Sequence, residues 1–129
     1  MNGRFLLDTN IVISIFAKDP QIHNRIANVA EIFVPCIVIG ELYFGAHKSV
    51  KIQENIARID EFALSNTILS CNAETAKRYG DIKNRLKDKG HPLPENDIWI
   101  AAIAQQYELT LVTQDSHFNA IDNLKIEAW

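Results

Sequence analysis

Short apolar runs alternate along the chain with longer stretches in which apolar residues recur every three or four positions. The short runs predict β-strands, and the longer stretches predict helices with one buried face. The predicted strands cover residues 4–7, 31–34, 67–69, 109–113 and 124–129. The predicted helices are one that follows the capping residues 8–10 and runs to about 16, and others over 22–30, 37–47, 50–63, 73–89 and 95–108.

The alternation predicts an α/β fold, because a strand followed by a helix returns parallel to the next strand through a right-handed crossover. We expect a mainly parallel central sheet of about four or five strands with helices on both faces. No repeat, low-complexity tract or Gly/Ser-rich linker divides the sequence, so residues 1–129 are predicted to form a single domain. The 129 residues, 47% of them hydrophobic, suffice for one core.

The sequence carries no signature of a membrane or secreted protein. No segment approaches the roughly 20 apolar residues of a membrane helix, and the first residues lack the basic and apolar regions of a leader. We therefore expect a soluble cytoplasmic protein without a membrane partner. Cys36 and Cys71 lie far apart and lack neighbouring Cys or His ligands, which argues against a zinc site or a disulfide framework and predicts buried, reduced thiols.

The net charge of −3 argues against a nucleic-acid partner if the acids are spread over the surface, because phosphate backbones attract basic surfaces. Acids gathered around a divalent cation are instead neutralised locally, which leaves the remaining surface free to be neutral or basic. The placement of the acids therefore matters more than their total.

Four acidic residues are predicted to meet at one edge of the sheet. Asp8 directly follows the first strand, and Asp115 lies two residues after the fourth. Ligands of parallel α/β sheets bind outside the carboxyl ends of the strands, so both side chains are expected at that edge. Glu41 interrupts an apolar helical stripe, and Asp97 opens an apolar helix whose first turn should lie nearby.

Such a cluster needs a positive partner, because buried carboxylates lose hydration and raise one another's pKa. No Lys or Arg occurs within two residues of any of the four acids, which favours a hard cation with oxygen ligands, Mg²⁺ or Mn²⁺. Asn10, Asn96 and Thr113 lie close to the acids in sequence and are candidates for orienting them or their waters.

Each acid except one also has an ordinary structural explanation. Asp8 and Asp97 suit helix caps, and Asp115 suits a turn. Glu41 has no capping role, because it stands in the middle of an apolar helical face. The histidine nearest the site, His117, is expected to orient a neighbour or to face solvent rather than to act as a general base.

The segment "KRYGDIKNRLKDKGH" is the most basic part of the sequence. Between residues 77 and 89 it holds six basic side chains against two acidic ones. Lys83, Arg85 and Lys87 are therefore candidates for holding the phosphate backbone of RNA. A solvated helix face explains the same charges without a ligand.

Four motifs, "LLDTN", "IGELYFGA", "LPENDIWIAAIA" and "LTLVTQDSHF", occur in an order and spacing that resemble the PIN-domain ribonucleases, and in particular the VapC-type toxins of type II (VapBC) toxin-antitoxin modules. The resemblance runs from near the first residue to the closing "LKIEAW". It implies a PIN fold and a Mg²⁺- or Mn²⁺-dependent endoribonuclease. It also implies that the metal-binding acids are Asp8, Glu41, Asp97 and Asp115, supported by Thr113, Asn10 and Asn96.

The resemblance further implies partners and a substrate class. The partners are a cognate VapB-type antitoxin, which covers the site and delivers a basic side chain to it, and a second copy of the chain in a homodimer. The substrate is transfer or ribosomal RNA. The likeness over the whole chain is closest to toxins that cut initiator tRNA in its anticodon loop. A housekeeping RNA-processing PIN nuclease and a catalytically silent metal-binding scaffold are the alternatives.

Two other classes that gather acids at strand ends fit the sequence less well. A receiver-type signalling domain needs an Asp after its middle strand, where this chain has "LSCN". A phosphatase of the Asp-x-Asp type needs a second Asp two residues after the first, where this chain has Asn10.

Overall fold

The computed structural model describes residues 3–29 and 31–129 and contains a five-stranded sheet in which every pair of neighbouring strands is parallel. The strands are β1 (Arg4–Leu7), β2 (Glu31–Pro35), β3 (Thr67–Leu69), β4 (Thr110–Val112) and β5 (Ile126–Glu127). Their order across the sheet is β3-β2-β1-β4-β5. The predicted parallel α/β fold is confirmed.

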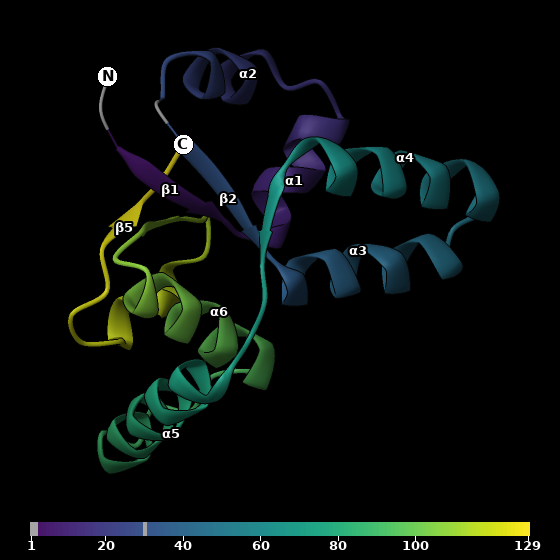
Figure 1. Ribbon diagram of the computed structural model, residues 1–129. Helices are drawn as coiled ribbons and strands as arrows, with labels where there is room; N and C mark the ends of the chain where they lie inside the picture. Colours follow the sequence, from purple (N-terminus) through teal and green to yellow (C-terminus); the bar gives the residue numbers. More distant parts are fainter. Residues whose placement is uncertain (1–2, 30) are drawn as a thin grey trace.

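Helices connect the strands and cover both faces of the sheet. They are α1 (Thr9–Phe16), α2 (Pro20–Ala27), α3 (Cys36–His47), α4 (Ile52–Ser65), α5 (Ala73–Asp88) and α6 (Glu95–Gln106), followed by the short 3₁₀ helix η1 (Ser116–Ala120). Figure 1 shows α5 and α6 on one side of the sheet, and α1, α2 and α4 on the other. Helices α3 and α4 lie side by side beyond the ends of β2 and β3.

The predicted and observed elements differ most at α2 and η1. The second helix was expected over 22–30 but begins at Pro20, because the Asp19 carboxylate accepts hydrogen bonds from the N–H groups of residues 21 and 22. It ends at Ala27, and residue 30 lies outside the described residues. The helix η1 was not predicted, since five residues are too few to display a helical period.

One buried hydrophobic cluster joins the sheet to the helices and includes residues of both β1 and α6. Leu6 and Leu7 of β1 are fully buried, as are Ile100 and Ile103 of α6. Burying side chains of this size contributes roughly 1.5–3 kcal/mol each. These rigid elements fix the positions of the residues that follow β1 and that begin α6.

The two cysteines differ from the expectation of buried thiols. Cys36 is half-buried at the start of α3, and Cys71 is exposed beyond β3, so the burial prediction was wrong for Cys71. Loss of hydration around its sulfur, together with the adjacent Cys36, raises the pKa of the Cys71 thiol to about 11. Cys71 is therefore protonated and weakly reactive at neutral pH.

The strand order creates a crevice at one edge of the sheet. The chain proceeds from β1 through β2 to β3 in one direction, and β4 then pairs with the opposite side of β1. Connections leave β1 and β4 toward opposite faces at this switch point, which is where ligands of open α/β sheets bind. Within residues 3–29 and 31–129, no helix has the length and apolar character needed to cross a membrane.

Candidate metal centre

The four acids singled out in the sequence line one open pocket of about 600 Å³. Asp8 follows β1 and Asp115 follows β4, so these two stand at the switch point of the sheet. Glu41 reaches the pocket from the middle of α3, and Asp97 reaches it from the first turn of α6. Four segments that are distant in sequence therefore bring four carboxyl groups to one place.

Asp8 is held rigidly at the floor of the pocket and is 5% exposed. One carboxylate oxygen caps α1 by accepting the N–H of Thr9 at 2.8 Å, and the other accepts the Thr113 hydroxyl at 2.7 Å. The Thr113 oxygen in turn accepts the N–H of Asp115 at 3.0 Å. Capping and site formation are thus not alternatives for Asp8, because a single carboxylate does both.

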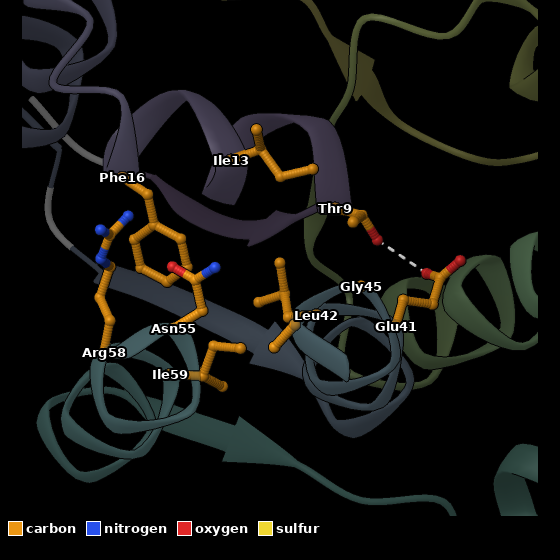
Figure 2. Close-up of a pocket in the computed structure, with 10 residues that line it drawn as sticks. Thr9, Ile13, Phe16, Glu41, Leu42, Gly45, Asn55, Arg58 and Ile59 are labelled. Carbon is orange, nitrogen blue, oxygen red and sulfur yellow. Dashed lines mark hydrogen bonds between the residues drawn. The ribbon is translucent and has the colours of Figure 1, made fainter. Parts of the chain in front are cut away.

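Glu41 is oriented by a residue that the sequence did not single out. The hydroxyl of Thr9 donates to Glu41 Oε1 at 2.7 Å, as Figure 2 shows. The two amide side chains expected near the acids, Asn10 and Asn96, also line the pocket. Asn10 accepts the N–H of Gln114 at 3.4 Å, which links the start of α1 to the segment after β4.

His117 bridges two of the acids. Its Nε2 lies 2.7 Å from Asp97 Oδ2, and its Nδ1 lies 2.9 Å from Asp115 Oδ1. The short helix η1 that follows β4 carries the ring into the pocket. His117 stands two residues after Asp115, so their proximity was evident from the sequence. Nothing in the sequence indicated the contact of His117 with Asp97 of α6.

The ionised carboxylates of Asp8 and Asp97 are unfavourable in the pocket unless a positive charge lies beside them. Burial raises the pKa of Asp8 above its ordinary value, and the charges of Glu41 and Asp115 raise it further, against the lowering effect of its two hydrogen bonds. Burial likewise raises the pKa of Asp97, and Asp8 and Glu41 add to this, whereas the contact with His117 lowers it. Ionisation of either carboxyl group is therefore less favourable in the folded protein than in water.

These residues fit a divalent cation. Carboxylate oxygens are the ligands that Mg²⁺ and Mn²⁺ prefer, and no Lys or Arg is among the described residues that line the pocket. Asp97, Asp115 and His117 offer ligand atoms that lie within 4.8 Å of one another. An open pocket of this size also leaves room for waters and for a phosphate group.

The raised pKa of Asp8 predicts a pH-dependent stability of the metal-free protein. The folded carboxyl binds its proton more tightly than the unfolded one, so its contribution to stability is full below the ordinary pKa of 3.8 and falls as pH rises through the folded pKa. In EDTA at pH 7, Asp8→Asn is expected to unfold at a higher temperature than the wild type, because it removes a charge that burial and the neighbouring acids make costly. The difference should shrink toward pH 4.

Thermal melts across this pH range, without cation and with Mn²⁺, provide the check. Cation should stabilise the wild type more than Asp8→Asn, because it binds the ionised site of the folded state. If Asp8→Asn melts at a lower temperature than the wild type in EDTA at pH 7, the charge of Asp8 does not destabilise the metal-free protein, and this prediction is wrong.

An apolar groove adjoins the acidic pocket. It has a volume of about 200 Å³ and lies between α1, α3 and α4, where Figure 2 shows Ile13, Phe16, Leu42 and Ile59 around it. Thr9, Ile13 and Glu41 line both the groove and the pocket. A chain lying in the groove would therefore end beside the carboxylates.

The basic candidates on α5 lie outside the pocket, and acids of the same surface pair with two of them. Lys83 Nζ lies 2.9 Å from an oxygen of Glu95, which lines the pocket. Arg85 Nε lies 3.1 Å from an oxygen of Asp81. For Lys87, the described part of the chain supplies no ion pair. The charge count along the sequence overestimated how much free positive charge this surface presents.

Comparison with known proteins places this architecture in a family. Residues 5–124 match the PIN domain family. The chain is 38% identical to ribonuclease VapC2 of Haemophilus influenzae over 129 residues, with 98% of both chains covered. It is 31% identical to the tRNA(fMet)-specific endonuclease VapC of Shigella flexneri, again over 129 residues and 98% of both chains.

A solved structure shares the whole fold. The DNA-bound VapBC complex of Salmonella typhimurium contains a chain that superposes with a TM-score of 0.91 at 31% identity, covering 98% of each chain. The likeness in sequence and in fold extends through all four segments that carry the acids. This chain therefore belongs to the PIN domain family and, within it, to the VapC ribonucleases.

Proposed function

We propose that this chain, as a single PIN domain in the cytoplasm, is the toxin of a type II toxin-antitoxin module and hydrolyses RNA with the help of Mg²⁺ or Mn²⁺. The observation that carries the proposal is the convergence of Asp8, Glu41, Asp97 and Asp115 on one pocket at the switch point of the sheet. Family membership supports the reaction class, since the relatives are ribonucleases. The same four carboxylates argue against a catalytically silent scaffold.

The residues of the pocket have two kinds of role in the proposed phosphodiester hydrolysis, cation binding and positioning of the carboxylates. The four acids would hold the cation, which when bound lowers the pKa of a water nucleophile and neutralises charge on the phosphate. Thr113 and the N–H of Thr9 fix both oxygens of Asp8, and the Thr9 hydroxyl fixes Glu41. Because these partners hold the carboxylates in place before substrate arrives, little reorganisation is needed during the reaction.

Transfer RNA is the proposed substrate, with the anticodon loop of initiator tRNA as the preferred target. The Shigella relative is a tRNA(fMet)-specific endonuclease, and it aligns with 98% of this chain. A single-stranded loop also suits an open pocket, because a strand outside a duplex can bend to present a phosphate to the cation that the acids would hold. Ribosomal RNA is the competing target.

Purified protein incubated with initiator tRNA and with elongator methionine tRNA tests the substrate proposal. We expect cleavage of the initiator tRNA within its anticodon loop and at least about tenfold slower cleavage of the elongator, the discrimination that roughly 1.4 kcal/mol provides. Equal cleavage of both, or cuts in ribosomal RNA alone, would contradict the initiator assignment while leaving the nuclease assignment standing.

We further propose that a cognate VapB antitoxin occupies the apolar groove between α1, α3 and α4. Ile13 is 53% exposed at the junction of groove and pocket, and the groove is largely apolar. A VapB segment with apolar side chains fits it, and a basic side chain at one end of that segment would reach the acids past Thr9 and Glu41. Solved relatives crystallised as VapBC complexes support this partner.

The basic side of α5 is proposed to hold the RNA backbone, through Lys83, Arg85 and Lys87. Lys83 adjoins the site, because its partner Glu95 belongs to the pocket wall. Exposed ion pairs of this kind contribute little to stability and open readily, so a phosphate can replace the carboxylate as the partner of Lys83. We also propose that the chain forms a homodimer, which would carry two of these basic α5 surfaces.

A further inference from the structure

The apolar groove between α1, α3 and α4 adjoins a second hollow of about 500 Å³. Phe16 and Arg58 line both spaces. Figure 2 shows Glu41 and Arg58 at opposite ends of the groove, with apolar side chains between them. The groove therefore has the acidic pocket at one end and the second hollow at the other.

The far end of the groove carries basic side chains. Lys18 and Arg58 line the second hollow, and Glu61 is the one acid among the described residues that line it. In the described part of the chain, Glu61 forms no ion pair with either of them. The guanidinium of Arg58 lies over the Phe16 ring, 5.5 Å from its centre, and a guanidinium held in this way can still bind an anion through its N–H groups.

The lining of the groove favours a peptide over RNA as its occupant. An RNA strand carries a phosphate at every nucleotide and needs cations along its path. Arg58 is the one Lys or Arg among the described residues that line the groove, and its middle is formed by Ile13, Leu42 and Ile59. A peptide can instead place apolar side chains in the middle and a charged side chain at each end.

The length of the groove sets the spacing of those two charges. Thr9, at the acidic end, and Phe16, at the basic end, lie on one wall of the groove at the two ends of α1. The helix between them rises by roughly 10 Å. A segment that follows this wall spans the distance with about seven helical residues or about three extended ones.

We propose that the antitoxin segment in the groove carries a basic side chain at the acidic pocket and, at its other end, a carboxylate that binds Arg58 and Lys18. This inference rests on the proposed VapB partner and adds the chemistry and the direction of its segment. Arg58 binds the carboxylate through two parallel N–H groups. The reverse direction is disfavoured, because it would set like charges against each other at both ends.

Carbodiimide coupling of the complex with full-length VapB, followed by mass spectrometry, tests the contact directly, because the reagent joins an amine to a carboxylate that touches it. We expect Lys18, and the amine introduced by Arg58→Lys, to couple to one acidic residue of VapB. Lys77, which is exposed on α5, should not couple to VapB.

Binding measurements test the energetic role of the contact. Arg58 is exposed on α4, so Arg58→Glu reverses a charge without altering the core. We expect this change to weaken VapB binding by at least about tenfold, and reversal of charge at the coupled VapB residue to restore the binding. Lys77→Glu, the matched charge reversal on α5, should bind VapB as the wild type does.

The outcomes separate this inference from the proposed partner. If Gly45→Phe disrupts VapB binding but Arg58→Glu does not, the groove remains the VapB site and the inference fails alone. An absence of coupling at both Lys18 and Arg58→Lys overturns it equally. Weaker RNA binding by Arg58→Glu with unchanged VapB binding would assign the basic end to RNA. If VapB does not bind the wild type, the proposed partner and the inference fail together.

Discussion

Asp97→Asn is expected to lower the rate of RNA cleavage by at least about a thousandfold, the scale of roughly 4 kcal/mol of lost transition-state stabilisation. The substitution removes the negative charge that holds the cation while keeping the size of the side chain and an oxygen that can still accept from His117. Cleavage of a fluorescent RNA under single-turnover conditions measures the loss.

The raised pKa of Asp97 provides an internal control for folding. Because burial and the neighbouring acids make the ionised carboxylate costly, Asp97→Asn should melt at the same temperature as the metal-free wild type or above it. Asp88→Asn, which neutralises an exposed acid at the end of α5, should cleave at the wild-type rate. Wild-type activity in a well-folded Asp97→Asn variant would show that the cluster is not the catalytic site.

Gly45→Phe is expected to weaken VapB binding by roughly 30- to 1,000-fold, the range of about 2–4 kcal/mol found for residues at the centre of an interface. Gly45 lines the groove from within α3, and a Cβ at this position meets nothing within 4 Å. A larger side chain can therefore begin at this position without a clash at its Cβ, and we expect a phenyl ring there to fill part of the groove. A helix-interior Gly is itself unfavourable.

Titration of VapB against the variant, read both as binding and as inhibition of cleavage, measures the effect. Gly80→Phe is the matched control, since Gly80 is also exposed, helical and free of contacts at its Cβ but lies on α5, away from the groove. Gly45→Phe should cleave RNA normally and resist VapB, whereas Gly80→Phe should be inhibited normally. Full inhibition of Gly45→Phe would exclude the groove as the VapB site.

The fold was largely predictable because its strands are short apolar runs with clear ends. The bounds of β1 and β3 agree with the prediction, and the parallel sheet follows from the alternation of strands and helices. The missed start of α2 was readable in principle, since Asp19-Pro20 is a helix-start signature. The missed η1 was not, because five residues carry no periodicity.

The location of the four acids was predictable, because Asp8 and Asp115 follow strands, Glu41 interrupts an apolar helical stripe and Asp97 opens an apolar helix, but the contacts between their side chains were not. Asp8 and Asp115 follow neighbouring strands, and topology alone brings them to one edge. The contacts of Thr9 with Glu41 and of His117 with Asp97 join residues 32 and 20 positions apart, and side-chain packing between elements decides them. Ion pairing of Lys83 across to α6 likewise depends on how two helices pack.

Mapping new 5′ ends in total bacterial RNA after incubation with the purified protein tests the central claim most directly. The acid cluster predicts discrete cuts with Mg²⁺ or Mn²⁺ that disappear in EDTA, return when cation is restored, and are absent from Asp8→Asn and Asp97→Asn. Cuts that persist in EDTA or in these variants would contradict a metal-dependent nuclease centre, as would an absence of cleavage by protein that binds divalent cation and is free of inhibitor.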